Sequence, residues 1–197
     1  MTELLLLSGG LDSAALAAWR KPRWCLFIDY GQRAAQAEHR AARTIARLLS
    51  LDFHALTLDC SALGGGLMSG HTPSAVAPTP EWWPYRNQLL VTFAAAWGVT
   101  RDITTIAIGT VSTDRRHRDG TMGFYQNLDA LLAYQEGGLR VQAPAIEYSS
   151  AELIAHSAIS DEILGWTHSC HTGNSACAAC PGCRKRQETL AIVGWPR

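Results

Sequence analysis

The sequence carries little charge and no long hydrophobic run, and both deficits narrow what the protein can do. Charged residues make up 17% of the 197 residues, and 17 basic side chains balance 17 acidic ones. A net charge of zero provides no broad positive field to attract nucleic acid or an anionic membrane. No apolar stretch reaches transmembrane length, and the first residues lack the basic segment of a secretory signal. We therefore expect a cytoplasmic protein with no membrane contact and no strong nucleic-acid signal.

Cysteine is scarce too, and four of the six cysteines gather near the C-terminus. In a reducing cytosol, clustered thiols indicate a metal site rather than disulfides. The spacing C-x6-C-x2-C-x2-C suits tetrahedral Zn²⁺ with no open position, which is the structural type of zinc site. An iron–sulfur cluster also takes four cysteines, so it stays an alternative. The candidate ligands are Cys170, Cys177, Cys180 and Cys183.

The stretch SGGLDS at residues 8–13 follows an apolar run at 4–7 and precedes an alanine-rich segment at 14–19. This order predicts a strand, a tight glycine turn and a helix whose free N–H groups bind an anion. Asp12 would repel a phosphate unless a divalent cation lay between them, so Mg²⁺ is implied. The expected phosphate-binding residues are Ser8, Gly9, Gly10, Leu11, Asp12 and Ser13.

The same stretch resembles the SGGxDS signature of the PP-loop ATP pyrophosphatases. It differs from the GxxxxGK phosphate loop, because no lysine follows the glycines. The resemblance implies that ATP is cleaved between its α- and β-phosphates and that AMP is transferred to a substrate oxygen.

Apolar strand patterns alternate with helical ones along the chain. Strands are expected at 4–7, 24–28, 53–58, 103–108 and 140–144, and helices at 14–19, 34–49, 87–97, about 124–135, 151–156 and 181–192. Such alternation predicts an α/β fold with a parallel sheet of about five strands. The loops after its first, second and fourth strands should meet at the carboxyl edge, where such sheets bind ligands. We expect a single domain over 1–197 that includes the cysteine segment 166–190.

Two long stretches break this pattern. Residues 59–84 are rich in glycine and proline yet contain Val76, Trp82 and Trp83, so we expect a mobile flap near the active site, part of which docks on the protein, with disorder as the alternative. Residues 109–123 form a polar loop with a basic run at 115–118. That run is either a solvated loop or a binder of phosphates or of an acidic segment of a partner.

Three further motifs occur in addition to the SGGLDS loop and the cysteines: DYGQR at 29–33, PYRN at 84–87 and WTHSC at 166–170. Together they resemble the QueC family of 7-cyano-7-deazaguanine synthases, over about residues 4–190. The resemblance implies a Rossmann-like, adenine nucleotide alpha hydrolase-like fold with a small C-terminal zinc knuckle. It also implies a C–N ligase of queuosine biosynthesis that adenylates 7-carboxy-7-deazaguanine with ATP, takes ammonia to an amide, and dehydrates the amide to a nitrile with a second ATP.

Other side chains are expected in this site. Arg86 is a candidate to bind phosphate or carboxylate bidentately beside Asn87, although capping and surface pairing would also explain both residues. Tyr30 and Gln32 would line the nucleotide or deazaguanine pocket, unless they only form a turn. The catalytic candidates are Asp12, Ser13, Arg86 and Asp114, and the further nucleotide-binding candidates are Asp29, Tyr30, Gln32 and Asn87.

One departure from the family keeps alternatives open. Asp114 retains an acidic position, but the Tyr-Pro-Asp-Cys-like stretch that QueC proteins carry after it is absent. A protein amine could therefore replace ammonia and become conjugated to the deazaguanine, as in QueC-like proteins associated with anti-phage defence. A tRNA-modifying PP-loop enzyme and a non-catalytic nucleotide-binding module are further alternatives. The resemblance also implies a homodimer, for which Trp82, Trp83 and Trp195 would be suitable exposed aromatics.

Overall fold

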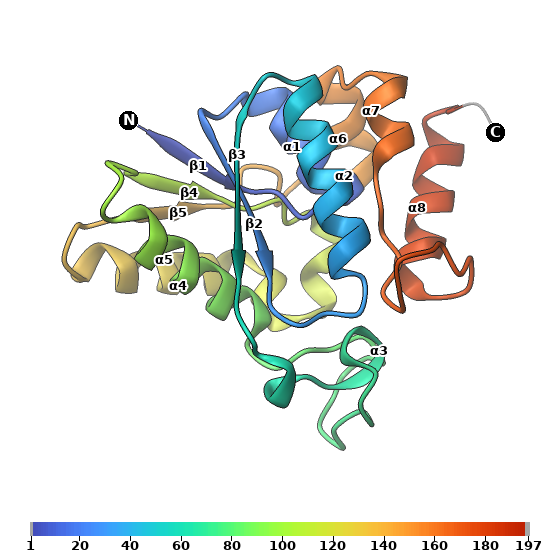
Figure 1. The fold of residues 1–197 in the computed structure, drawn as a ribbon, viewed down its shortest axis with the longest axis horizontal. Helices are drawn as coiled ribbons and strands as arrows, with labels where there is room; N and C mark the ends of the chain where they lie inside the picture. Colours follow the sequence, from blue (N-terminus) through green and yellow to red (C-terminus); the bar gives the residue numbers. More distant parts are fainter. Residues whose placement is uncertain (1, 196–197) are drawn as a thin grey trace.

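The computed structural model describes residues 2–195 and places one parallel sheet between two helical layers (Figure 1). Within these residues the sheet has five strands in the order β3-β2-β1-β4-β5, and every neighbouring pair is parallel. The strands are β1 (Glu3–Leu6), β2 (Trp24–Asp29), β3 (Asp52–Thr57), β4 (Thr105–Ala107) and β5 (Arg140–Gln142). The predicted α/β fold with a Rossmann-like sheet is confirmed.

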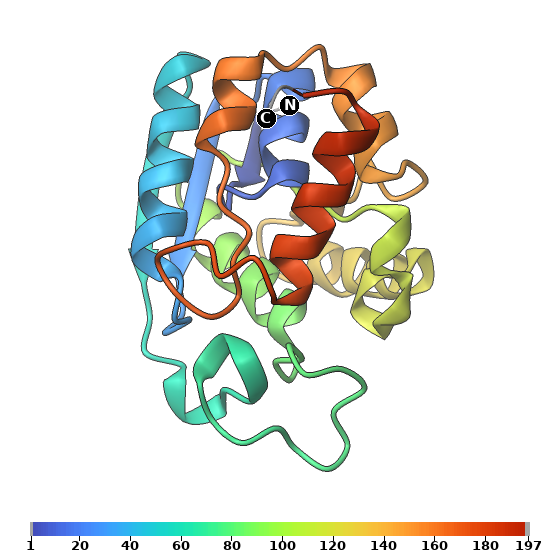
Figure 2. The same ribbon diagram turned by 90° about the vertical axis from the view of Figure 1, so that its right-hand side faces the viewer.

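Leucines of the first strand point alternately to the two helical layers, which explains why the run is apolar throughout. Leu4 packs in the core with Val91 and Leu128, whereas Leu5 packs with Leu16 and Ile45 on the other face. One layer contains α4 (Arg86–Gly98) and α5 (Met122–Tyr134). The other contains α1 (Leu11–Arg20), α2 (Ala35–Leu48), α6 (Ser150–Ser157), α7 (Asp161–Trp166) and α8 (Pro181–Ile192) (Figures 1 and 2). Across residues 2–195, no helix has the length and apolar content to cross a bilayer.

Local signals account for several helix ends. Ser149 caps α6: its hydroxyl accepts from the Glu152 N–H at 3.2 Å, and the Glu152 carboxylate accepts from the Ser149 N–H at 2.7 Å. Ser149 is thus the N-cap, and Ser150 is the first residue of the helix. Helix α7 was not expected, because six residues are too short to show a helical repeat.

The segment 59–84 packs against the rest of the chain. It contains the 3-10 helix η1 (Ser61–Leu63) and the short helix α3 (Gly66–Ser69), and it lies beyond the carboxyl ends of β2 and β3 (Figure 1). Trp83 is buried, with its ring 4.9 Å from that of Tyr30 in an edge-on contact. Trp83 was therefore wrongly expected among the exposed aromatics of a dimer interface. The loop 109–123 contains two further 3-10 helices, η2 (Ser112–Arg116) and η3 (Arg118–Gly120).

Candidate active site and metal centre

The SGGLDS loop turns at the carboxyl end of β1 and leads into α1. Gly9 has φ of +82°, and a Cβ there would lie 2.7 Å from the Glu38 carbonyl oxygen, so only glycine fits against α2. The Ser13 hydroxyl donates to the Gly10 carbonyl at 3.1 Å and lies 3.1 Å from the Ser8 hydroxyl. In the described chain no side chain caps α1 at Gly10. The N–H groups of its first turn are thus available to an anion.

A cavity of about 300 Å³ opens over this loop. That volume is at the lower end of the range for small-molecule pockets. Its walls come from the SGGLDS loop, the turn after β2, the flap segment 59–84, the start of α4, the loop after β4 and the cysteine segment. Of the site residues expected from the sequence, the cavity is lined by Ser8, Gly10, Leu11, Asp12, Ser13, Tyr30, Gln32, Arg86, Asn87 and Asp114.

Asp29 lies outside the cavity lining and holds the turn after β2, because one of its oxygens accepts from the Gly31 N–H at 3.0 Å. Gln32 is buried and braces the same turn. Its oxygen accepts from the Tyr30 N–H at 2.9 Å, and its amide nitrogen donates to the Glu38 carboxylate at 2.8 Å. Gln32 therefore both holds the turn and contacts an acid that borders the cavity.

Glu38 was not expected in the site, because its helical position did not reveal which face meets the cavity. Burial raises the pKa of its carboxyl to about 7, and the hydrogen bond from Gln32 only partly opposes this shift. Near neutral pH this carboxyl is therefore poised between its two protonation states.

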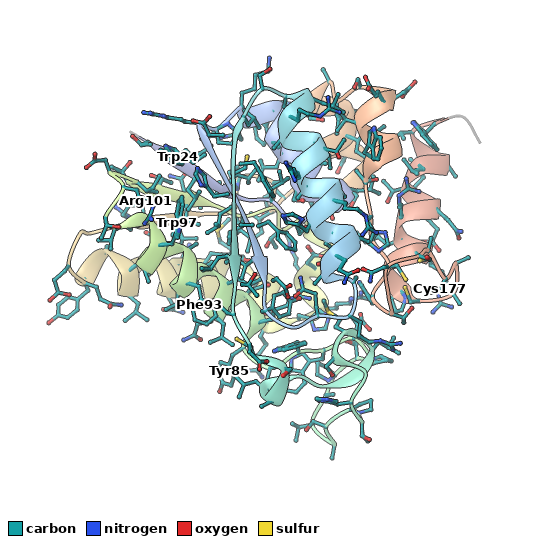
Figure 3. The ribbon with its side chains drawn as sticks, viewed as in Figure 1. Trp24, Tyr85, Phe93, Trp97, Arg101 and Cys177 are labelled. Atoms are coloured by element: carbon teal, nitrogen blue, oxygen red, sulfur yellow. The ribbon has the colours of Figure 1, made fainter. Side chains whose placement is uncertain are left out.

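Arg86 opens α4 and is half-buried beside Tyr30. Burial by itself lowers the pKa of its guanidinium, but Tyr30 and the carboxylates of Asp119 and Asp114 outweigh that effect and raise it. Its Nε donates to the Asn87 amide oxygen at 3.3 Å, and the Asn87 nitrogen donates to the Asp119 carbonyl at 3.1 Å. Neither Arg86 nor Asn87 caps α4, whose N-cap is the exposed Tyr85, labelled in Figure 3. Arg86 is thus a charged group held at the cavity wall.

A lysine that was not expected in the site joins two of the expected acids. The Lys185 ammonium lies 2.9 Å from an Asp12 oxygen and 3.2 Å from an Asp114 oxygen. Burial acts to lower the pKa of Lys185, but the two carboxylates outweigh it and raise the pKa. The other Asp12 oxygen, Oδ1, is buried and has no hydrogen-bond partner within residues 2–195. A buried carboxylate oxygen without a partner, on a side chain that shares the Lys185 ammonium with a second acid, fits a hard divalent cation such as Mg²⁺.

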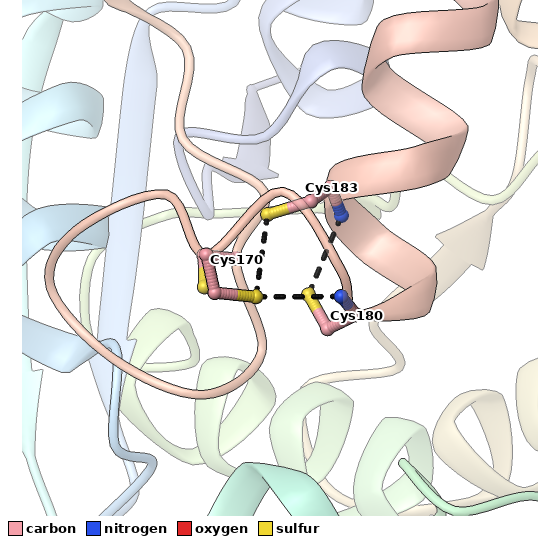
Figure 4. Close-up of side chains that lie close together, drawn as sticks. Cys170, Cys180 and Cys183 are labelled. Carbon is pink, nitrogen blue, oxygen red and sulfur yellow. Dashed lines mark hydrogen bonds between the residues drawn. The ribbon is translucent and has the colours of Figure 1, made fainter.

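The four cysteines lie together, as their spacing predicted, and Figure 4 labels Cys170, Cys180 and Cys183 among them. Their sulfur atoms all lie within 4.8 Å of one another, which one metal ion can bridge. Backbone N–H groups of His171 and Cys183 donate to the Cys180 sulfur at 3.3 and 3.4 Å, as expected for thiolates that bind metal. Cys180 also caps α8, with Pro181 in its first turn. The cluster could hold a metal ion through four sulfurs, which leaves no position open to substrate.

The cysteine segment is attached to the phosphate loop and to α2. The His168 N–H donates to the Gly9 carbonyl at 2.9 Å, and the Asn174 side chain accepts from the Ala37 N–H at 2.9 Å. His168 and His171 both line the cavity, and burial lowers the pKa of His171 to about 4, so it is neutral at pH 7. The hydrogen bonds of His168 with Gly9 and of Asn174 with Ala37 each join residues more than a hundred positions apart, and no local sequence pattern indicates them.

The flap segment 59–84 docks on the basic loop after β4. A buried Glu81 oxygen lies 2.8 Å from Arg116 and 3.9 Å from His117. Arg115 instead pairs with Glu147 at 2.5 Å, away from the flap. Arg116 thus pairs with a glutamate of its own chain and also borders the cavity, so binding of the basic run to phosphates or to an acidic partner segment stays a prediction.

Comparison with known proteins identifies the family. The family model described as "Queuosine biosynthesis protein QueC" matches residues 2–194. The chain belongs to the QueC family. It is 30% identical over 202 residues to 7-cyano-7-deazaguanine synthase 1 of Desulfitobacterium hafniense, an alignment that covers 96% of this chain and 91% of that protein. It is 31% identical over 212 residues to 7-cyano-7-deazaguanine synthase of Pseudomonas aeruginosa, with 97% and 94% covered.

Solved structures support the fold of this QueC-family chain and nothing beyond it. A predicted subunit of a tRNA methyltransferase from Methanocaldococcus jannaschii matches with a TM-score of 0.50 at 16% identity, over 80% of this chain and 75% of that one. The tRNA thiolase NcsA from Methanococcus maripaludis, solved with its 4Fe-4S cluster, also matches with a TM-score of 0.50, at 14% identity. That alignment covers 96% of this chain and 63% of the thiolase.

Proposed function

We propose that this protein is an ATP-dependent C–N ligase that adenylates the carboxylate of 7-carboxy-7-deazaguanine for attack by an amine. The observation that carries the proposal is a single cavity lined by the SGGLDS loop, by the aromatic and amide groups of Tyr30 and Gln32, and by the Arg86 cation. Family membership over residues 2–194 and the names of its relatives support the deazaguanine as substrate class.

A carboxylate is a poor electrophile, because its leaving group would be oxide. In the proposed first step its oxygen attacks the α-phosphorus of ATP, the bond to the β-phosphate oxygen breaks, and pyrophosphate leaves. The acyl-adenylate then offers AMP as a leaving group. The uncapped N–H groups of α1 and the Ser8 and Ser13 hydroxyls would bind pyrophosphate, and Arg86 would stabilise charge on the transferring phosphoryl group or the carboxylate.

Asp12 and Asp114 would hold Mg²⁺ beside the phosphates, since Asp12 Oδ1 lacks a partner in the described chain. Mg²⁺ bound there would neutralise part of the phosphate charge. The four-cysteine cluster would hold structural Zn²⁺ and position the segment that donates a hydrogen bond to Gly9.

The second step is attack of ammonia on the acyl carbon, which expels AMP and releases a proton to give the amide. A second ATP would adenylate the amide oxygen, and loss of AMP and a proton from that adduct leaves the nitrile. If a protein amine attacked instead, the product would be a deazaguanine conjugated to a partner protein.

Incubation of the protein with ATP, Mg²⁺ and 7-carboxy-7-deazaguanine, with and without ammonium, tests the proposal by mass spectrometry. We expect AMP in both cases and the nitrile only with ammonium. A deazaguanine mass on a protein amine, with no nitrile, would favour the conjugating role associated with phage defence. If no AMP formed under any condition, the ligase would be rejected in favour of a nucleotide-binding module.

The Asp12→Ala variant examines the loop itself. We expect AMP release to fall by about 100-fold or more, because the loop loses a cation ligand next to the phosphates. Asp52→Ala, on the exposed part of β3, is a matched control that should keep full activity. Circular dichroism should show both variants folded, and full activity in Asp12→Ala would contradict the pyrophosphatase assignment.

A further inference from the structure

Of the 17 basic residues in the sequence, only Lys21 and Lys185 are lysines. Lys21 is exposed at the end of α1, whereas Lys185 borders the cavity. An arginine offers a flat fork of donors, but an ammonium is a compact point charge that donates in three directions. Between two carboxylates, as Lys185 is placed, the compact charge can exchange one oxygen partner for another with little movement.

The neighbours of Lys185 on α8 show that this orientation is particular to it. Arg184 is exposed, and Arg186, which also borders the cavity, donates to the Thr167 hydroxyl at 3.1 Å and to the Leu164 carbonyl at 3.2 Å. Only Lys185 of this basic triplet contacts Asp12 and Asp114. Because α8 starts at the cysteine cluster, with Cys180 as its cap, the cluster sets where this ammonium lies.

The position of the ammonium points to an anion at the loop. Asp12 is in the first turn of α1, where the positive end of the helix dipole disfavours a further cation. The two carboxylates hold Lys185 there, yet its side chain remains one-third exposed and borders the cavity with Gly10 and Ser13. A phosphate bound by the first N–H groups of α1 would therefore also meet the ammonium.

We propose that Lys185 is a phosphate-binding residue that moves from the Asp12 and Asp114 carboxylates to the pyrophosphate end of ATP when Mg²⁺ takes its place between them. The inference rests on the proposed ATP chemistry of the loop. Two carboxylates and one ammonium carry a net charge of minus one, which repels phosphate. A divalent cation reverses the sign of that charge, so Mg²⁺ and the phosphates bind cooperatively.

Calorimetric titration of the Lys185→Gln variant tests the exchange, with MgCl₂ alone and with pyrophosphate in Mg²⁺ as separate ligands. We expect the Kd of pyrophosphate to rise about 10- to 100-fold, because a charge-assisted hydrogen bond is lost. The Kd of Mg²⁺ alone should fall, since the ammonium no longer competes for the carboxylates. Lys21→Gln makes the same substitution outside the site and should change neither value. If both ligands bound Lys185→Gln as they bind the wild type, or both more weakly, Lys185 would be only a structural ion pair and the proposal overturned.

Amine labelling of the wild-type protein gives a readout that does not depend on how Lys185→Gln folds. Mass spectrometry after acetylation should show Lys185 labelled faster in Mg²⁺ alone and protected when pyrophosphate is added, with Lys21 unchanged throughout. Equal labelling of Lys185 without ligand, in Mg²⁺ alone and in Mg²⁺ with pyrophosphate would overturn the proposal. These measurements need no deazaguanine. If AMP never formed but the Kd values of pyrophosphate and Mg²⁺ changed in opposite directions, the proposed ligase would fail and the role of Lys185 would stand. If AMP formed and these two Kd values did not change in opposite directions, only the role of Lys185 would fail.

Discussion

At the scale of single residues, Glu38 shows how the fold changes the chemistry of a side chain. Its carboxyl accepts from the Gln32 amide, which is itself held by the backbone of the turn after β2. Burial nevertheless dominates and raises the pKa to about 7. An acid with a raised pKa binds its proton more tightly in the folded state than in the unfolded state. This contribution of Glu38 to stability is complete below the ordinary glutamate pKa of 4.5 and is lost as the pH rises through about 7.

The Glu38→Gln variant should remove this pH dependence. Glutamine keeps an oxygen that accepts from Gln32 and never ionises, so we expect its free energy of unfolding at pH 8 to exceed that of the wild type by about 1–3 kcal/mol. At pH 5 the two proteins should differ much less. Urea unfolding at both pH values measures the difference. The exposed Glu136→Gln variant is the control, and a Glu38→Gln curve parallel to the wild type across this range would refute the role of burial.

The residues that motifs predicted and those that they missed differ in a physical way. Ser8, Gly10 and Ser13 are placed at the cavity by backbone geometry within one turn, which a short motif specifies. Lys185 is placed by the face of a helix that meets a distant acid, and its neighbours Arg184 and Arg186 carry the same charge. Nothing in that triplet indicated which of its three cations contacts Asp12 and Asp114.

At the scale of elements, the flap segment 59–84 is positioned by charge as well as by Trp83. Buried Glu81 meets Arg116 of η2, and the Thr79 hydroxyl lies 3.5 Å from the His117 ring. The sequence predicted that the segment docks near the site, because tryptophans favour burial. Its partner could not be predicted, since the basic run offered several equivalent arginines.

Arg116→Gln should loosen this flap. The pair is partly exposed on the Arg116 side, so we expect a loss of about 1 kcal/mol in local stability and faster cleavage by a protease near the exposed Val76. Arg115→Gln breaks only the pair with Glu147 and is the matched control. Limited proteolysis followed by mass spectrometry compares the two variants. Equal cleavage rates would show that the Glu81 pair does not hold the flap.

At the scale of the whole molecule, the cysteine cluster ties the end of the chain to its beginning. Leu190 of α8 packs in one core cluster with Leu11 of α1 and Leu153 of α6. The hydrogen bond from His168 to Gly9 adds a direct backbone contact to the phosphate loop. Metal binding at the cluster should therefore stabilise both the C-terminal segment and the loop.

Cys180→Ser should lose the metal and lower stability by about 3 kcal/mol, which corresponds to about 6–12 °C in Tm for a chain of this size. Cys60→Ser, a buried cysteine outside the cluster, should keep the metal. Elemental analysis and thermal unfolding measure both effects, and the visible absorption of the wild type distinguishes zinc from an iron–sulfur cluster. A full equivalent of metal in Cys180→Ser would contradict the four-cysteine site.

The sequence by itself determined the α/β alternation, the SGGLDS turn, the cysteine cluster and the resemblance to the QueC family, because each depends on residues that are close together in the chain. It did not predict α7, the docking of Glu81, the burial of Glu38 or the pairing of Lys185 with Asp12. Asp12 and Lys185 are 173 positions apart, and only the packing of α8 against the sheet domain brings them within 2.9 Å. Long-range pairs of this kind depend on how helices are oriented in three dimensions, which no local spacing of residues encodes.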